Sequence, residues 1–317
     1  MTLETNAFTS YLSIGNREDL SDTIYRISPT DTPFLSGIDK ETATGVKHEW
    51  QTQALATALT TNAHLEGDAA SAEAATATVR LFNYCQISKK VPRVTNTEEV
   101  IEKAGRGSEM AYQEMLKGLE LKRDMESAML ASTSAQAAGN GTTIRRAGPV
   151  NSYITTNKSL TSTSSVSGDG TDISTDSDTT RAFTETLLKT QLQNCWTQGG
   201  KPDVVMAGAF NKQQFSSFQG RSSAIEDASD RKITANVTAY ESDFGTLKVV
   251  ANRFQRSRDV YAFQMDMWAI AYLKGRKMVS QDLAITGDSR AKQIISEWTL
   301  VSRQEKANAR IGDLTTS

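Results

Sequence analysis

The stretch SEMAYQEMLKGLELKRDMESAMLA, from Ser108 to Ala131, is the longest helical pattern in the chain and predicts its central element. Ser108 is a suitable N-cap, because its hydroxyl can accept a hydrogen bond from the first helical turn. Polar residues form one narrow strip, while apolar residues spread over the rest of the circumference: Met110, Tyr112, Met115, Leu116, Leu119, Leu121, Met125 and Met129. A helix with so wide an apolar surface is expected to make contacts on more than one side. We interpret the methionines as adaptable packing residues.

Upstream of this helix, two strand patterns flank a segment that is too poor in large apolar residues to build a core. Residues 46–51 and 79–89 alternate in the manner of strands, and the Ala/Thr-rich segment between them has only three charged residues, Glu66, Asp68 and Glu73. Paired limbs of about twenty residues could reach about 60 Å, whereas a compact chain of this length has a radius of gyration of about 19 Å. An isolated ribbon is marginally stable in water, so a protruding hairpin predicts a partner beneath it. The alternative is an ordinary sheet with a long Ala/Thr loop.

The N-terminal residues 16–38 predict an arm with one apolar stripe. Asn16 can cap a helix that ends at Ser28-Pro29, because the residue before proline avoids the α region. The apolar stripe of this helix falls at positions i, i+4 and i+7: Leu20, Ile24 and Ile27. A second, shorter helix is expected after a cap at Asp31 or Thr32, with these residues in order: Pro33, Phe34, Leu35 and the terminating Gly37.

Between residues 97 and 180 the sequence predicts a short helix and then a long polar segment. The helix begins at Thr97 and ends at Gly105. Residues 151–180 are rich in Ser, Thr and Gly, so we expect them to run over the exterior. Four aspartates in this segment lack the spacing of an EF-hand, which favours a solvated loop over a calcium site: Asp169, Asp172, Asp176 and Asp178.

The rest of the chain alternates between helix and strand patterns. A predicted helix lined by Phe183, Leu188 and Cys195 is followed by a strand at 204–207 and a helix around Phe215 and Phe218. After a charged loop at 220–232, two more strands are predicted, at 233–239 and 247–250. Three later strand patterns have no helix of their own: 260–263, 268–273 and 294–300. We expect these three to join the long helix, so that residues 180–255 form an inserted unit.

Composition excludes several classes of function. The chain has 317 residues, a net charge of −2 and a pI near 5.9, which gives no indication of electrostatic capture of nucleic acid or of an anionic membrane. No apolar run reaches the roughly 18 residues of a transmembrane helix, and no signal-peptide pattern begins the chain. Cys85 and Cys195 lie among apolar neighbours and are expected to be buried, reduced thiols.

No catalytic, cofactor-binding or metal site is predicted. His48-Glu49 lacks the second histidine of a zinc HExxH helix, and the only other histidine is His64. Residues 287–291 lack the final glycine of a nucleophile elbow. A carboxylate-dependent hydrolase remains an alternative, because any two acidic residues could meet in space. The basic run of Arg253, Arg256 and Arg258 is interpreted as a solvated turn in preference to a phosphate site.

The order of several short motifs resembles the SU10-type major head protein family of tailed bacteriophages. The resemblance covers nearly the whole chain and is carried by these segments: 16–38, His48-Glu49-Trp50-Gln51-Thr52, 83–89, 121–126, Gly200-Lys201-Pro202-Asp203 and Asp243-Phe244-Gly245. The resemblance implies an α+β, HK97-like capsid fold. It also implies an N-terminal arm (1–43), an extended hairpin loop (44–92), a peripheral domain (93–179) with a spine helix (108–132) and a Ser/Thr/Gly-rich linking segment, an axial domain (180–255), and returning peripheral strands with the C-terminus (256–317).

The function implied by the resemblance is structural: self-assembly into an icosahedral shell of pentamers and hexamers around the phage genome. No cofactor, enzymatic activity, membrane contact or sequence-specific binding of the enclosed double-stranded DNA is expected. The expected partners are a portal and a separate scaffolding protein, if scaffolding is needed at all, since only fifteen residues precede Asn16. The expected location is the virion, after assembly in the host cytoplasm. Residues expected at subunit interfaces are Leu20, Ile24, Ile27, Phe34, Trp50, Leu55, Leu59 and Leu65. The alternative is another phage structural subunit, in a tail tube or as a decoration protein.

Overall fold

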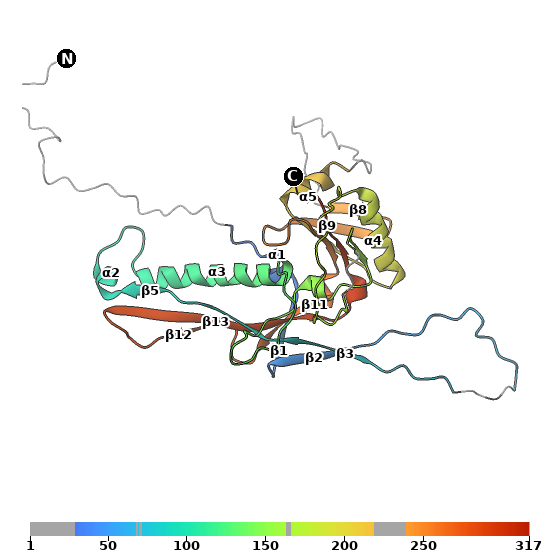
Figure 1. Cartoon of the computed structure of the whole chain (residues 1–317), viewed down its shortest axis with the longest axis horizontal. Helices are drawn as coiled ribbons and strands as arrows, with labels where there is room; N and C mark the ends of the chain where they lie inside the picture. The colour runs from blue at the N-terminus through green and yellow to red at the C-terminus, as the bar shows by residue number, and fades with distance from the viewer. Residues whose placement is uncertain (1–28, 68, 70–71, 163–165, 219–238, 317) are drawn as a thin grey trace, which may run out of the picture.

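The computed structural model describes residues 29–67, 69, 72–162, 166–218 and 239–316. Two six-stranded sheets, one two-stranded ribbon and a long helix make up its framework (Figure 1). The ribbon extends away from the sheets on the side opposite the first turns of the long helix (Figure 1). The predicted arm stripe of Leu20, Ile24 and Ile27 lies outside the described residues.

The first sheet has the order β1-β11-β13-β12, with β4 and β5 also paired to the long strand β13. Its strands are β1 (Asp39–Ala43), β4 (Gln86–Lys90), β5 (Arg93–Thr95), β11 (Trp268–Leu273), β12 (Val279–Asp282) and β13 (Ser289–Ser302). β1 runs parallel to β11, whereas the partners of β13 are antiparallel to it. Part of the predicted arm is therefore an integral strand of a sheet, and part of the predicted extended loop, β4, is as well.

The long helix α3 (Glu109–Leu130) packs against this sheet, as its sequence pattern predicts. Ser108 caps it, because the Ser108 hydroxyl accepts a hydrogen bond from the Ala111 N–H at 3.2 Å. The side chains that enter the core with the sheet tryptophans come from one side of the helix: Leu121, Met125 and Met129, with Leu130 beside them. Lys90 and Lys292 reach from the sheet to Asp124 and Glu114 at 2.7 and 3.0 Å.

Two short helices flank α3. The helix α1 (Pro33–Gly37) forms with Thr32 as its N-cap residue, as predicted. The helix α2 (Asn96–Val100) is shorter than the predicted helix and begins earlier, because its cap is Thr95, whose hydroxyl accepts from the Glu98 N–H at 3.3 Å. Three single-turn 3₁₀ helices complete the helical elements of the described chain: Val150–Ser152, Met265–Met267 and Glu305–Ala307.

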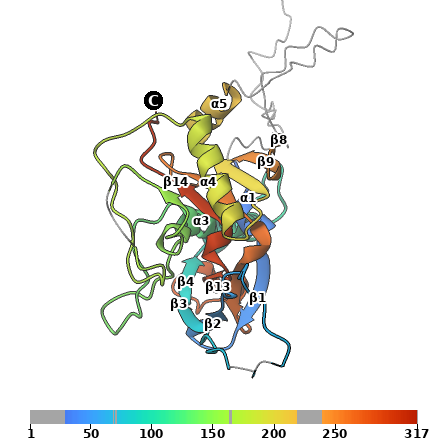
Figure 2. The same cartoon turned by 90° about the vertical axis from the view of Figure 1, so that its right-hand side faces the viewer.

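The second sheet has the order β6-β14-β10-β7-β9-β8. Its strands are β6 (Lys158–Ser159), β7 (Val204–Ala207), β8 (Ala239–Ser242), β9 (Gly245–Ala251), β10 (Val260–Phe263) and β14 (Ala309–Ile311). The helix α4 (Glu185–Thr197) lies across it in Figure 2, and Leu188, Leu192 and Cys195 bury their side chains in its core. The helix α5 (Ala209–Ser216) follows β7 and adds Phe215 to this core. Most of the strand predicted at 233–239 lies outside the described residues.

The predicted assignment of residues 260–263 to the first sheet is wrong. β10 pairs with β7 and β14, so it lies near the middle of the second sheet, and all four of its residues are buried. A short apolar run indicates that a strand is buried, but it does not indicate which other strands pair with it. The second unit therefore includes β10 and β14 and does not end at residue 255.

The expectation that residues 151–180 run over the exterior is also wrong in part. Tyr153 and Ile154 have no exposed surface, and Asn157 and Ser174 are nearly as deeply buried. The Asn157 amide donates to the Lys306 carbonyl at 2.6 Å, which ties this segment to the residues before β14. The polar composition of the segment did not predict this burial, because amides and hydroxyls can be buried when they are hydrogen-bonded.

The turn expected at Arg253–Arg258 is solvated only in part: Arg253 is exposed, whereas Arg256 joins a buried charge cluster. Asp259 is fully buried, and both of its oxygens accept from Nη2 of Arg310 at 3.2 and 3.1 Å. The Arg256 guanidinium lies 3.6 Å from Asp259 and also pairs with Asp176. Asp176, an aspartate that the sequence placed in a solvated loop, therefore holds residues 166–181 against the second sheet.

Both cysteines are buried and unpaired, as predicted. Burial raises the pKa of Cys85 to about 11, and the Glu297 carboxylate adds to the rise while Arg145 opposes it. Burial also raises the pKa of Cys195 to about 12, although a hydrogen bond from Asn157 opposes the rise. In the part of the chain that the structure describes, no helix is both long enough and apolar enough to cross a membrane.

Candidate subunit interface

The predicted hairpin forms, with β2 (Lys47–Thr52) antiparallel to β3 (Val79–Tyr84). The register pairs Lys47 with Tyr84 and Thr52 with Val79. Beyond this last pair lies the hairpin tip, residues 53–78, whose described part projects away from both sheets as an open loop (Figure 1). The hairpin is thus an ordered ribbon at its base and an irregular extension at its end.

Buried hydrogen bonds fix the base of the hairpin to the body of the protein. Asn83 has no exposed surface; its amide donates to the Leu300 carbonyl at 2.8 Å and its carbonyl oxygen accepts from the Gly148 N–H at 2.8 Å. The indole N–H of Trp50 donates to the Ser302 carbonyl at 2.7 Å. The direction of the hairpin is therefore set by the end of β13 and by the residues before the turn at Val150–Ser152.

The hairpin tip carries three leucines with little cover. Leu55, Leu59 and Leu65 are 97%, 68% and 84% exposed. The two limbs are joined near their base by a hydrogen bond from the Gln53 amide to the Thr76 carbonyl at 3.0 Å. Leaving three aliphatic side chains in water forgoes about 1.5–3 kcal/mol for each that could be buried. A second apolar surface would gain this free energy by covering them.

Two of the predicted interface residues instead serve the chain's own core. Phe34 is fully buried, with its ring 4.9 Å from that of Phe263 and 6.1 Å from that of Trp268. Its assignment to an interface with an adjoining subunit is wrong, because α1 folds onto α3 and the sheet of its own chain. Trp50 is half-buried against the same core and directs its N–H to Ser302.

One residue that organises this region was missed from the sequence. Glu126 is fully buried on α3, and its two carboxylate oxygens accept from the backbone N–H groups of Phe34 and Leu35 at 2.9 and 2.7 Å. It also accepts from the Asn252 amide at 2.7 Å. Burial raises the pKa of Glu126, while the three donors oppose that rise. The only sequence signal was a carboxylate directly after Met125, within the apolar part of the helix.

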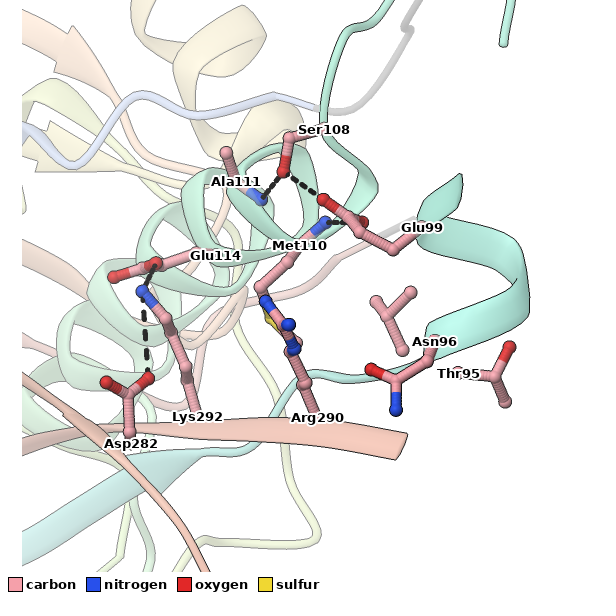
Figure 3. Close-up of a pocket in the computed structure, with 11 residues that line it drawn as sticks. Thr95, Asn96, Glu99, Ser108, Met110, Ala111, Glu114, Asp282, Arg290 and Lys292 are labelled. Atoms are coloured by element: carbon pink, nitrogen blue, oxygen red, sulfur yellow. Dashed lines mark hydrogen bonds and ion pairs between the residues drawn. The ribbon is translucent and has the colours of Figure 1, made fainter. Parts of the chain in front are cut away.

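A cavity of about 340 Å³ lies at the opposite end of α3 (Figure 3). Glu99 caps the helix there, because it accepts from the Ser108 hydroxyl at 2.6 Å and from the Met110 N–H at 3.2 Å. The Ser108 hydrogen bond lowers the pKa of Glu99. Lys292 lies between Glu114 and Asp282, at 3.0 and 3.9 Å. These pairings assign Glu99 to helix capping, and Glu114, Lys292 and Asp282 to contacts at the sheet.

Metal ligands do not gather in the described part of the chain. Among those residues, no group of three or more His, Cys, Asp or Glu side chains is placed to hold a metal ion. His48 lies 3.9 Å from Glu41, and His64 is in the hairpin tip beside Asn62. The structure does not bring the two histidines together.

Comparisons with known proteins agree with the predicted family. A sequence profile of the SU10 major capsid protein family matches residues 3–315. The major capsid protein of Escherichia phage Phieco32 is 41% identical over 123 residues, which are 39% of this chain and 35% of that protein. The chain therefore spans about a third of the length of this curated relative.

Solved structures of low sequence identity share the fold. The cyanophage A-1(L) capsid asymmetric unit matches with a TM-score of 0.62 and 13% identity, over 98% of this chain and 99% of that one. The phage G gp27 major capsid proteins and gp26 decoration proteins match with a TM-score of 0.54 and 12% identity, over 99% and 100%. The predicted α+β, HK97-like capsid fold is confirmed. Because the family match extends over nearly the whole sequence, this chain belongs to the SU10 major capsid protein family.

Proposed function

We propose that this chain is the shell-forming subunit of a tailed-phage head, and that many copies assemble into an icosahedral shell of pentamers and hexamers. The observation that carries this proposal is the hairpin tip: three exposed leucines at the end of a ribbon whose base is held by buried hydrogen bonds. A rigid base sets the direction of the tip, and the leucines supply apolar area for contact with a neighbour. We assign no catalytic role to the chain.

The domain division that supports this role follows the sheets. We propose a peripheral domain made of α3 and the first sheet, and an axial domain made of the second sheet with α4 and α5. The axial domain then begins near residue 180 and includes β10 and β14. The N-terminal arm is 1–43, although β1 within it belongs to the peripheral domain, and the extended hairpin loop is 44–92.

The residues that we propose for contact with an adjoining subunit come from the exposed hairpin tip and from the predicted arm stripe. They are Leu55, Leu59 and Leu65 in the hairpin tip, and Leu20, Ile24 and Ile27 of the arm stripe in the assembled shell. We propose that the shell forms in the host cytoplasm, encloses double-stranded DNA without reading its sequence, and joins a portal. The net charge of −2 suits an enclosure that does not hold DNA tightly.

Removal of the hairpin tip tests this function. Residues 53–78 are replaced by Asn-Gly, which suits a two-residue turn between Thr52 and Val79. We expect a folded, soluble subunit, because the described residues of the removed tip lie outside the core. We expect electron microscopy to show no closed shells. Normal shells from this variant would overturn the interface assignment, while tubes or rings from the wild-type protein would favour a tail-tube subunit.

A substitution set separates apolar contact from loop length. Leu55, Leu59 and Leu65 are changed together to Ser, and the matched control changes Ala54, Ala56 and Ala58 to Ser in the same limb. We expect the leucine variant to lose most shell formation and the alanine variant to keep it. Equal yields of shells from the two variants would show that the leucines are not the contact.

A further inference from the structure

The apolar surface of α3 has a second side that the described residues leave largely open. Met115, Leu119, Lys122 and Glu126 fall at i, i+4, i+7 and i+11, so they share one face, here called the outer face of α3. Met115 is 51% exposed, Leu119 is half-buried and Lys122 is exposed. Tyr112 and Leu116, which border Met115, are likewise half-buried. The side that packs on the first sheet is a different one, marked by Leu121 and Met125.

The N-terminal segment of the chain already covers one end of this face. The backbone N–H groups of Phe34 and Leu35 donate to Glu126, so α1 lies on the outer face at its C-terminal end (Figure 1). Arg123 borders the face on the side of Phe254, whose ring lies 5.2 Å from its guanidinium. From Lys122 back to Met115, the described residues provide no comparable cover.

We propose that, in the unassembled subunit, residues 16–27 of the same chain dock on the outer face of α3 through Leu20, Ile24 and Ile27. The dimensions fit. The predicted helix of twelve residues is about 18 Å long, and Met115 lies about 17 Å along α3 from Glu126. Residues 28–32 join this helix to α1 and can span at most about 17 Å, which keeps the stripe within reach of the open part of the face.

The short connection favours docking within one chain before assembly. A flexible link of this length gives an effective local concentration on the order of millimolar, far above the concentration of free subunits in a dilute solution. Lys122 can lay its aliphatic stem along the stripe and keep its ammonium group in water. Docking would also cover two sets of apolar side chains that otherwise favour aggregation.

A consequence for assembly follows, and it rests on the proposed function. The same stripe that docks within the free subunit would pass to an adjoining copy in the shell, which is an exchange of one element between identical chains. The residues around Ser28-Pro29 would act as the hinge of this exchange. The free subunit would then carry its own competitor for the contact that it makes in the shell.

Engineered disulfides in the full-length protein test the docking. The pairs Ile24→Cys with Leu119→Cys and Ile24→Cys with Met115→Cys are oxidised in the monomer fraction at low micromolar concentration. The control pair is Asp22→Cys with Leu119→Cys, because Asp22 lies on the opposite side of the predicted helix from the stripe. A disulfide requires Cα atoms within about 7 Å, so we expect at least one test pair to close at least about tenfold faster than the control, at a rate independent of protein concentration.

Equal rates for the test and control pairs, or disulfides only between chains, would overturn docking within the subunit. Amide hydrogen exchange of the otherwise unmodified monomer gives a second measurement. Residues 20–27 should be protected in the wild-type monomer and lose at least about tenfold of that protection in Leu119→Glu, while α4 keeps its protection. Absence of protection in the wild type would also overturn the proposal. Shell formation is scored separately by electron microscopy, so failure of the docking and failure of the proposed function are distinguishable.

Discussion

The carboxylate of Glu126 accepts a hydrogen bond from Nδ2 of Asn252 at 2.7 Å, and this contact joins the spine helix to the residues that follow β9. The same carboxylate holds α1 through two backbone N–H groups. One buried side chain therefore fixes the N-terminal segment, the helix and the second sheet to one another. Its position makes Glu126 the most informative single residue to change.

We expect Glu126→Gln to destabilise the subunit by about 1–3 kcal/mol. The glutamine NH₂ group would replace one carboxylate oxygen, so one backbone N–H group that Glu126 now accepts from would lose its hydrogen-bond acceptor. Chemical denaturation measures the loss. The control is Glu120→Gln, a half-exposed residue that pairs with Lys117 at 2.9 Å, and its cost should stay below about 1 kcal/mol. Equal losses in the two variants would contradict the central role of Glu126.

The pH dependence of this effect has a defined sign. Burial raises the folded-state pKa of Glu126 above the ordinary value of a glutamate, so the folded state holds this proton more tightly than the unfolded state does. The associated stability is fully present below the unfolded pKa and is lost as pH rises through the folded pKa. The stability of the wild type relative to Glu126→Gln should therefore fall as pH rises from 4.5. A relative stability that rises over this range would contradict the assignment.

Removal of one charge from the buried Asp259–Arg310 pair should be severe. We expect Asp259→Asn to cost about 3–5 kcal/mol, because it leaves the Arg310 guanidinium buried without its counter-charge. The double variant with Arg310→Met should cost less than the sum of the single changes. Asp282→Asn is the control: its side chain is 84% exposed and 3.9 Å from Lys292, so its effect should be within about 0.5 kcal/mol. Additive costs for the buried pair would contradict this coupling.

The base of the hairpin should loosen when Asn83 is changed. Asn83→Ala leaves the Leu300 carbonyl and the Gly148 N–H without their buried partner, at a cost of about 1–3 kcal/mol. Amide hydrogen exchange in β2 and β3 should rise more than in α4. Asn62→Ala, in the exposed tip, should change neither stability nor exchange at the base. Unchanged exchange in β2 and β3 of Asn83→Ala would contradict the anchoring role.

The thiols of Cys85 and Cys195 should be unreactive toward thiol reagents in the folded protein. With the pKa of Cys85 near 11 and that of Cys195 near 12, the thiolate fraction at pH 8 is on the order of one in a thousand or less. A thiol-specific colorimetric reagent should react with both cysteines only after unfolding. An engineered Leu59→Cys, placed in the exposed tip, should react within the mixing time under native conditions. Rapid reaction of the unmodified protein would contradict the burial of these thiols.

Several elements could be predicted from the sequence because their determinants are local. The helix α3 follows from the cap at Ser108 and from apolar spacing over six turns, and β2 and β3 follow from alternation on either side of an Ala/Thr-rich segment. The short helix α1 follows from Pro33 and Gly37. The exposure of Leu55, Leu59 and Leu65 follows from the lack of other large apolar residues around them.

Other features depended on contacts between distant segments. The pairing of β10 with β7 and β14, the burial of Glu126, and the pairing of Arg256 with Asp176 join residues far apart in the sequence. By itself, the sequence determined which segments form helices and strands and which leucines lack a core, because periodicity and composition record local burial. Only the tertiary structure decided which sheet each strand joins, that Phe34 packs into its own subunit, and which charges are buried. The physical reason is that strand pairing and charge pairing depend on residues far away in the sequence, which a local pattern cannot identify.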